Sequence, residues 1–164
     1  MTTQEHPIHI SFRFAAPGDV DTYFHWANDD LVRENSFTSS KIKYIDHVKW
    51  FRSNILSENC RMYLFIQQDN IPVGQVRIDR KKMETTVGIS IDEKYRGKSL
   101  GLKMIELATD DYLNRNPNEN LTAYIKPENT RSYSIFRKAG FGNEQKVIEG
   151  NIICIKLTKT YTNR

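Results

Sequence analysis

The sequence predicts a mixed α/β fold with about seven strands and about four helices, and three observations lead to that class. Segments of alternating apolar and polar residues, typical of strands, are interspersed with segments whose apolar residues recur at helical spacing. Three of the expected strands follow one another over residues 62–91, which favours an antiparallel meander over a pure doubly wound sheet. No repeat or linker interrupts the pattern, so one domain is expected over residues 1–164, with its core at about 8–158.

The N-terminal third is expected to contain one strand and two or three helices. IHISFRFA, residues 8–15, alternates like a strand, and Asp19 can cap a helix over residues 19–28. Residues 29–42 have no clear period and are expected to form a loop or a short irregular helix. Apolar residues return at helical spacing over residues 44–58.

The rest of the chain alternates between strands and helices. Strands are predicted at 62–68, 73–81, 85–91 and 121–126, helices at 100–115 and 129–139, and a hairpin at 144–158 that turns at EGN. Gly140 ends the second of these helices.

Composition excludes several classes of protein. With 38% hydrophobic and 27% charged residues, the chain is too apolar to be disordered. Its mean hydropathy is −0.61, and no apolar run approaches the ~20 residues needed to span a bilayer. MTTQEHPIHISF at the N-terminus lacks the features of a secretory signal, so a cytoplasmic location is expected.

Few residues in the sequence could bind a metal, and the charge favours an anionic small ligand. The chain has 2 cysteines and 4 histidines, without a CxxC or a zinc-ligand spacing, so no metal is expected. The net charge is +4 and the pI about 9.0, which suits a nucleotide or phosphate. Because the basic residues are scattered, no nucleic-acid or membrane partner is expected.

The most informative stretch is ISIDEKYRGKSLGLKMIE, residues 89–106. A strand ends at Ile91, and the basic, glycine-containing segment RGKSLG leads directly into a helix. The first amides of a helix have no partners within it, and the helix dipole adds partial positive charge there. Glycines let a phosphate approach the backbone closely. The segment therefore predicts an anion site, although neither a P-loop nor a dinucleotide fingerprint is present.

A second stretch, YIKPENTRSYSIFRKAGF at residues 124–141, has a strand followed by a helix that Asn129 can cap. Together the two stretches resemble the GNAT superfamily of N-acetyltransferases. Its Q/R-x-x-G-x-G/A motif matches RGKSLG at 96–101, and its later Asn-initiated helix ending in GF matches residues 129–141. The expected element order also matches that fold, in which the fourth and fifth strands splay apart.

The resemblance implies that acetyl-CoA is the cofactor. The family's pyrophosphate site corresponds to residues 96–101, its pantetheine-pairing strand to residues 89–91, and a backbone N–H near Ile91 would polarise the thioester carbonyl. The cofactor-binding residues implied are Ile89, Ser90, Ile91, Arg96, Gly97, Lys98, Ser99, Leu100, Gly101, Asn129, Ser132 and Phe136.

Two positions depart from the family pattern. The usual central glycine is Ser99, whose backbone can still contact a phosphate. The tyrosine that often serves as general acid is Phe136, which cannot donate a proton. A thiolate of pKa ~8.5 can leave without full protonation, and Tyr133 is either a substitute acid or an ordinary surface residue.

The identity of the general base is left open. Where several relatives have a glutamate on the fifth strand, this chain has Tyr124. A phenol of pKa ~10 is a poor base at neutral pH, so Tyr124 either acts catalytically or orients a water or the substrate. Glu128 and Asp79 are carboxylate alternatives, and both are also ordinary surface or cap residues.

The acceptor segment, residues 31–51, resembles that of the nucleotide-amino-sugar N-acetyltransferases of the pseudaminic-acid pathway. The resemblance implies that Arg33 or Arg77 grips a diphosphate and that Trp50 stacks on a base or sugar. The plainer interpretations are that Trp50 is a core residue, that His47 caps a helix or hydrogen-bonds locally, and that Arg77 is a cross-strand ion-pair partner. The substrate-binding residues implied are Arg33, Ser36, His47, Trp50 and Arg77.

The expected function is direct transfer of an acetyl group from acetyl-CoA to a nucleotide-linked amino sugar. The alternatives are an N-terminal peptide acetyltransferase and a catalytically weak acetyl-CoA-binding regulatory module. A homodimer formed through exposed strand edges is also compatible with the sequence.

Overall fold

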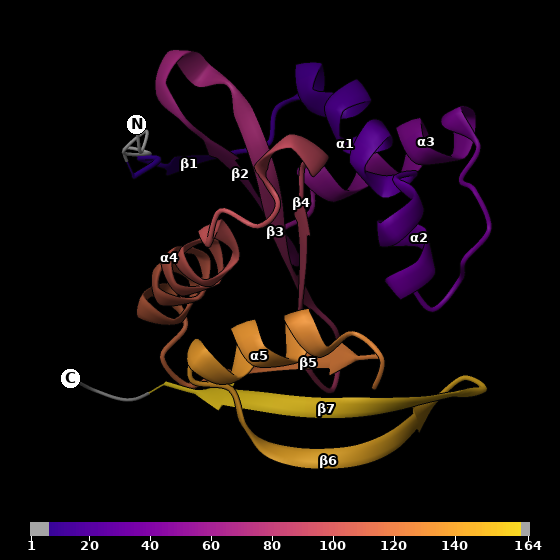
Figure 1. The fold of residues 1–164 in the computed structure, drawn as a ribbon, viewed down its shortest axis with the longest axis vertical. Helices are drawn as coiled ribbons and strands as arrows, with labels where there is room; N and C mark the ends of the chain where they lie inside the picture. The colour runs from indigo at the N-terminus through magenta and orange to yellow at the C-terminus, as the bar shows by residue number, and fades with distance from the viewer. Residues whose placement is uncertain (1–6, 162–164) are drawn as a thin grey trace, which may run out of the picture.

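The computed structural model describes residues 7–161, which form one seven-stranded sheet with helices on both faces (Figure 1). The strand order is β1-β2-β3-β4-β5-β7-β6. The strands are β1 (Ser11–Phe14), β2 (Cys60–Ile66), β3 (Pro72–Arg80), β4 (Thr85–Ile91), β5 (Asn120–Ile125), β6 (Gly142–Glu149) and β7 (Ile152–Thr160).

Five α-helices connect the strands. They are α1 (Val20–Ala27), α2 (Asp30–Asn35), α3 (Tyr44–Ile55), α4 (Leu100–Arg115) and α5 (Thr130–Lys138). Three short 3-10 helices, η1 (Pro17–Asp19), η2 (Gln68–Asn70) and η3 (Glu93–Tyr95), were not predicted, because a single turn leaves no periodicity in the sequence.

The central pair of strands separates after a short contact. Neighbouring strands are antiparallel from β1 to β4 and from β5 to β6, whereas β4 and β5 are parallel. Only Thr85 and Thr86 at the start of β4 pair with β5. This register confirms the predicted mixed, mostly antiparallel sheet with a splayed central pair.

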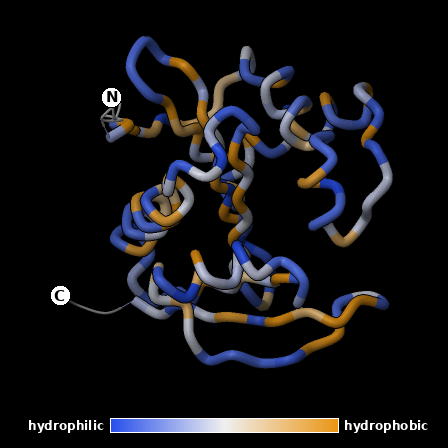
Figure 2. Tube along the Cα trace, viewed as in Figure 1, coloured by the Kyte–Doolittle hydropathy of each residue, from blue (hydrophilic) through white to orange (hydrophobic). Residues whose placement is uncertain are grey.

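Two apolar clusters cover the two faces of the sheet. One packs alternate residues of the central strands against α4 and α5, with Met104, Ile105 and Phe141 fully enclosed. The other packs β2 against α1 and α3 around Phe51. Figure 2 shows apolar residues along the central strands, whereas β6 is largely hydrophilic. Within residues 7–161, no helix is both long and apolar enough to cross a membrane.

Most predicted elements are present with boundaries shifted by a few residues. Helix α4 begins and ends at the predicted residues. The strand predicted at 8–15 is limited to β1, because only Ser11–Phe14 pair with β2. The segment 29–42, expected to be a loop or a short irregular helix, contains the six-residue α2, which the Asp29 carboxylate caps by accepting from the Val32 amide at 3.1 Å. Asp19 occupies the N-cap position of α1 without capping it. Its carboxylate turns back to Arg13 and to the Ala16 amide instead.

Candidate functional site

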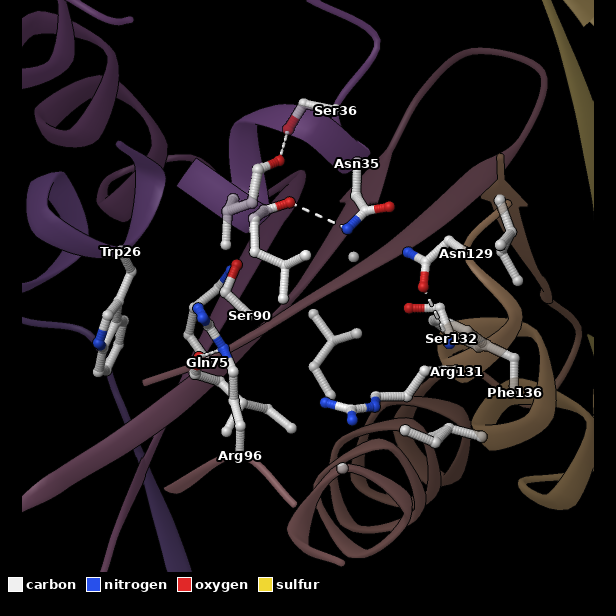
Figure 3. A pocket seen from close by; sticks show the side chains of 18 of the residues that line it. Trp26, Asn35, Ser36, Gln75, Ser90, Arg96, Asn129, Arg131, Ser132 and Phe136 are labelled. Atoms are coloured by element: carbon white, nitrogen blue, oxygen red, sulfur yellow. Dashed lines mark hydrogen bonds between the residues drawn. The ribbon is translucent and has the colours of Figure 1, made fainter. Parts of the chain in front are cut away.

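A cavity of about 730 Å³ opens where β4 and β5 separate. Its walls come from β3, β4 and β5, from the end of α1, from α2, from Trp50 of α3, from the start of α4 and from the length of α5. Figure 3 shows Trp26, Gln75, Ser90 and Arg96 on one side of the cavity and Asn129, Arg131, Ser132 and Phe136 on the other. Segments that are far apart in sequence therefore share one site.

The backbone of β4 presents polar groups to this cavity. In an antiparallel ladder, successive residues turn their N–H and C=O groups to opposite sides. The Asp92 amide donates to the Val73 carbonyl at 2.9 Å, so with the observed register the even-numbered residues of β4 pair with β3. Ile89 and Ile91 therefore direct their N–H groups towards β5, into the gap. Ser90 directs its N–H group towards β3.

The segment between β4 and α4 forms a concave surface of amide groups. Gly97 and Ser99 both have left-handed backbone conformations, with φ of 74° and 58°. Alternation of this kind turns successive N–H groups inwards, as in an anion-binding nest. Among the described residues, none accepts a hydrogen bond from the amides of residues 97–101, and no side chain caps α4.

Two glycines keep this surface open. A Cβ on Gly97 would meet nothing within 4 Å, so an incoming group has free access to its backbone. A Cβ on Gly101 would lie 3.0 Å from Ile135 and 3.2 Å from Ile91, so a side chain there would force these two side chains to shift by a few tenths of an ångström. Unpartnered amides at a helix N-terminus beside a gap in a sheet fit the diphosphate and extended arm of an acyl-CoA.

The Arg96 side chain is already engaged by the protein. Its Nη2 lies 2.7 Å from Asp29, and its Nε donates to the Ile91 carbonyl at 3.1 Å. Its guanidinium is therefore held against the α1–α2 junction, and the nest keeps only its backbone amides for an anion. The Lys98 ammonium lies 5.7 Å from the Tyr95 ring, and Lys98 is not among the lining residues.

Helix α5 brings no tyrosine hydroxyl to the cavity. Asn129 caps the helix by accepting from the Ser132 amide at 3.1 Å, as predicted. Phe136 lines the cavity and packs edge-on against Phe141, with ring centroids 5.0 Å apart. Tyr133 does not line it, since its hydroxyl donates to Glu144 at 2.6 Å.

Tyr124 does line the cavity and has a partner that sequence reasoning missed. Its hydroxyl lies 2.6 and 2.8 Å from the two carboxylate oxygens of Glu84, in the turn before β4. Burial and this carboxylate raise the pKa of Tyr124 well above its usual range, so it remains a phenol at neutral pH. Glu84 is 40 residues away in sequence, which explains why no local pattern revealed it.

The face of the sheet beneath α1 and α3 has a second set of polar side chains. The Arg77 guanidinium lies 5.0 Å from the Trp50 ring and 2.7 Å from Asp79. Gln75 donates to the Ser90 hydroxyl at 3.2 Å, while its own side-chain oxygen is buried without a partner. Gly88 pairs with Arg77, and a Cβ there would meet nothing within 4 Å. The sheet is thus open on this side of the gap.

Arg33 holds a loop beside the cavity. It donates to the Thr38 carbonyl at 3.0 Å and to the Ser36 hydroxyl at 3.0 Å, and its Nε is buried without a partner. Burial lowers the pKa of Arg33, which means that its positive charge is poorly solvated. No carboxylate of the described chain lies within ion-pair distance of it, so this cation has no counter-ion.

The cavity wall is strongly biased in charge. None of its residues within the described chain is Asp or Glu. Two of its cations, Arg77 and Arg96, are paired with carboxylates outside the wall, and the others have no such partner among residues 7–161. The lining cations are Arg33, Arg77, Arg96, Lys126, Arg131 and Lys138.

Most residues singled out from the sequence lie together, and a few do not. Those that line the cavity are Arg33, Ser36, Trp50, Arg77, Ile89, Ser90, Ile91, Arg96, Gly97, Ser99, Leu100, Gly101, Tyr124, Asn129, Ser132 and Phe136. Those outside it are His47, Asp79, Lys98, Glu128 and Tyr133. His47 is buried beneath α1, with its ring nitrogen 2.9 Å from the Val20 carbonyl. Tyr23, Gln75, Lys126 and Arg131 line the cavity as well, and no local pattern marks them as site residues.

The family model described as acetyltransferase (GNAT) domain matches residues 9–142. No curated protein sequence matches this chain.

Solved structures of similar fold include several acetyltransferases. Aminoglycoside acetyltransferase AAC(6')-Ib with coenzyme A and kanamycin has a TM-score of 0.77 at 16% identity, covering 93% of this chain and 95% of that one. Spermidine N-acetyltransferase from Vibrio cholerae with CoA and spermine has a TM-score of 0.79 at 15% identity, covering 91% and 93%. A domain from Methanocaldococcus jannaschii has a TM-score of 0.77 at 21% identity, covering 92% and 99%.

Proposed function

The chain belongs to the acetyltransferase (GNAT) domain family of acetyl-CoA-dependent N-acetyltransferases, and from that premise we propose that its acceptor is an anionic small-molecule amine. The most specific form of the proposal is the amino group of a nucleotide-linked amino sugar. The observation that carries the proposal is the cavity wall, which has six cations and no carboxylate among the described residues.

The 96–101 segment would hold the cofactor through its backbone. Its inward-facing amides and the start of α4 suit the diphosphate, and the Ile89 and Ile91 backbone suits an extended amide-containing arm. Asn129, Ser132 and Phe136 would form the opposite wall from α5. When bound, acetyl-CoA supplies an acetyl group activated as a thioester.

The residues around the gap would then promote transfer to the amine. The Ile91 N–H is directed into the gap, where it can donate to a carbonyl oxygen and stabilise negative charge that develops there. Tyr124 remains protonated, so its hydroxyl would orient the acceptor or a water that takes up the amine proton. Glu84 would fix the direction of that hydroxyl.

Direct transfer agrees with the positions of the thiols. Cys60 and Cys154 are both buried and neither lines the cavity. Burial raises the pKa of Cys60 to about 12, and it also raises that of Cys154. Neither is therefore a thiolate nucleophile at neutral pH. Because Phe136 cannot act as an acid, the leaving thiolate would depart without a tyrosine proton.

An anionic acceptor follows from the electrostatics of the wall. Kanamycin and spermine, which are present in the complexes of two proteins of similar fold, are polycations. A polycation in this cavity would meet Arg33, Arg77 and Lys126, and no residue of the cavity wall is a carboxylate. A phosphate or diphosphate would instead supply the counter-ion that Arg33 lacks. Trp50, held against Arg77, offers a flat surface for a base or sugar ring.

The test is release of CoA from acetyl-CoA with a panel of amines. The panel contains UDP-linked 4-amino sugars, the same amino sugars without the nucleotide, N-terminal peptides, kanamycin and spermine. We expect turnover with the nucleotide-linked sugar and a much higher KM for the free sugar.

Three other outcomes would overturn parts of the proposal. Turnover with kanamycin or spermine would contradict the anionic acceptor. Turnover restricted to peptides would indicate an N-terminal acetyltransferase. Tight acetyl-CoA binding with no turnover across the panel would favour the regulatory-module alternative.

A further inference from the structure

Three buried polar atoms of residues 7–161 have no hydrogen-bond partner, and all three belong to residues of the cavity wall. They are the hydroxyl oxygen of Tyr23, the Nε of Arg33 and the side-chain oxygen of Gln75. Folded proteins pair nearly all of their buried polar groups, because each group left unpaired keeps its full cost of desolvation. Their confinement to one cavity favours a ligand that completes their hydrogen bonding.

Tyr23 carries a neutral hydroxyl on the α1 side of the cavity. The residue is only 4% exposed, and its ring packs against Trp26 and Phe51 with centroids 5.6 and 5.1 Å apart. Burial raises the pKa of Tyr23 well above its usual range, so the side chain is a neutral phenol at neutral pH. A phenol can both donate and accept a hydrogen bond. The described chain supplies Tyr23 with neither partner.

Gln75, on β3, presents an unpaired acceptor beneath α1. Its Nε2 donates to the Ser90 hydroxyl at 3.2 Å, while its own oxygen has no partner (Figure 3). An amide oxygen can only accept, so a ligand must bring an N–H or O–H to it. The amide can turn towards a ligand at low cost, because the last torsion of glutamine has a broad preference. The bond to Ser90 is also at the long end of the usual range.

The unpaired atoms differ in what they require from a ligand. A phosphate oxygen only accepts, so a phosphate can satisfy the Arg33 Nε but not Gln75. An ammonium can donate to Gln75, but it would add positive charge to a wall that has six cations and no carboxylate among the described residues. A hydroxyl is neutral and can donate to Gln75 or accept from Tyr23. The set therefore fits a hydroxylated ring that lies beside an anionic group.

We propose that Gln75 and Tyr23 are specificity-determining residues that hydrogen-bond ring hydroxyls of the acceptor. The proposal rests on the proposed function, in which the acceptor is an anionic small-molecule amine, and narrows that acceptor to one built on a hydroxylated ring. An analogue that lacks such a hydroxyl leaves its partner buried and unpaired, and therefore binds poorly. In the free protein the unpaired Tyr23 hydroxyl lowers stability, so removing it affects stability and acceptor binding in opposite directions.

The first experiment measures thermal unfolding of the ligand-free protein. Tyr23→Phe removes an unpaired buried hydroxyl and breaks no hydrogen bond of the described chain, so its Tm should rise by about 2–4 °C. Tyr63→Phe is the matched control, since Tyr63 is 1% exposed, lies outside the cavity wall, and donates to Asp111 at 2.9 Å. Because that substitution removes a made hydrogen bond, its Tm should fall by a similar amount.

The second experiment measures affinity by calorimetry for a UDP-linked 4-amino sugar and for analogues in which one ring hydroxyl is replaced by hydrogen. The wild type should bind at least one analogue about 30-fold more weakly than the full sugar. In Tyr23→Phe or Gln75→Met the full sugar should bind about 10-fold more weakly, and the preference over that analogue should fall below about 3-fold. Coenzyme A affinity should be unchanged in both variants. Gln145→Met, on an exposed position of β6 outside the wall, should behave as the wild type.

The outcomes separate this proposal from the proposed function. Failure of the wild type to bind the UDP-linked sugar would overturn the anionic sugar acceptor and this proposal with it. Binding of the sugar with undiminished affinity and hydroxyl preference in Tyr23→Phe and Gln75→Met would overturn this proposal alone. A fall in the Tm of Tyr23→Phe as large as that of Tyr63→Phe would do the same, because the hydroxyl would then have a partner in the free protein.

Discussion

The two sides of the cavity present polar groups from different parts of the chain. On the α4 side the polar groups are backbone amides, held by the left-handed conformations of Gly97 and Ser99 and by the strand pairing of β4. On the α2 side they are side chains, such as Arg33 and Arg77, whose directions depend on other side chains and on loop carbonyls.

This difference bears on how each side tolerates substitution. A backbone-built surface survives changes of side chain as long as the φ and ψ angles are kept, so Ser99 can stand where the family usually has glycine. On a surface formed by side chains, replacing a single residue changes which ligand binds best. We therefore expect substitutions on the α4 side to act through sterics, and those on the α2 side to act on the acceptor alone.

The largest effect is expected from Gly101→Val, which tests whether the α4 side depends on backbone access. A Cβ at this position already crowds Ile135 and Ile91, so a branched side chain should push α4 away from β4. We expect about a 100-fold loss of coenzyme A affinity by calorimetry, with about 1–3 kcal/mol of destabilisation from overpacking.

Gly88→Ala is the matched control on the other side of the gap, where a Cβ meets nothing. It should leave coenzyme A binding unchanged and weaken only the acceptor. If Gly101→Val bound coenzyme A as tightly as the wild type, the close approach of α4 would have no role in binding.

Tyr124→Phe should give the next largest effect, a loss of about 30-fold in kcat, within the range for a single proton-transfer or orienting group. Because its raised pKa keeps Tyr124 protonated, the wild-type rate should rise with pH as the acceptor amine deprotonates. It should not fall again below pH 10. The measurement is a kcat profile from pH 6 to 10.

Tyr133→Phe provides the comparison, because the Tyr133 hydroxyl is bonded to Glu144 outside the cavity. We expect its turnover to stay close to that of the wild type. A large loss in Tyr133→Phe, with none in Tyr124→Phe, would reverse the assignment of the two tyrosines.

Arg77→Met should affect the acceptor without affecting the cofactor. It removes the cation beside Trp50 and leaves Asp79 unpaired near the cavity. We expect the KM of an anionic acceptor to rise about 10-fold, the value of one charge-assisted hydrogen bond, with an unchanged KM for acetyl-CoA. A parallel rise in the KM of the acceptor and the KM of acetyl-CoA would mean that Arg77 contributes to binding of both ligands.

The smallest effect is expected from Ser99→Gly. Serine at φ 58° is in a left-handed conformation that costs an L-residue about 1 kcal/mol or more. Glycine removes that strain but gains freedom in the unfolded chain, so the net stabilisation should be at most about 1 kcal/mol in urea unfolding. Coenzyme A affinity should be unchanged. Marked destabilisation would indicate a structural role for the Ser99 hydroxyl.

Local signals in the sequence were sufficient for the strands, most of the helices and the nest. The alternation over 85–91 marks β4, and the turn chemistry of RGKSLG predicts an anion site at the start of α4. The capping role of Asn129 was also readable, because a cap acts within one turn. Helix α2 was less readable, since six residues give too few periods to distinguish a helix from a loop.

The contacts that complete the site could be decided only by the tertiary structure. Glu84 meets Tyr124, Asp29 meets Arg96 and Lys126 meets Glu34 across separations of 40 to 92 residues. Each pairing depends on where the splay of β4 and β5 places two surfaces, which no local pattern encodes. The sequence by itself determined the elements and the backbone-built half of the cavity, because φ and ψ preferences and caps are local. The side-chain-built half depended on the fold, because charge and burial at those positions are properties of neighbours distant in sequence.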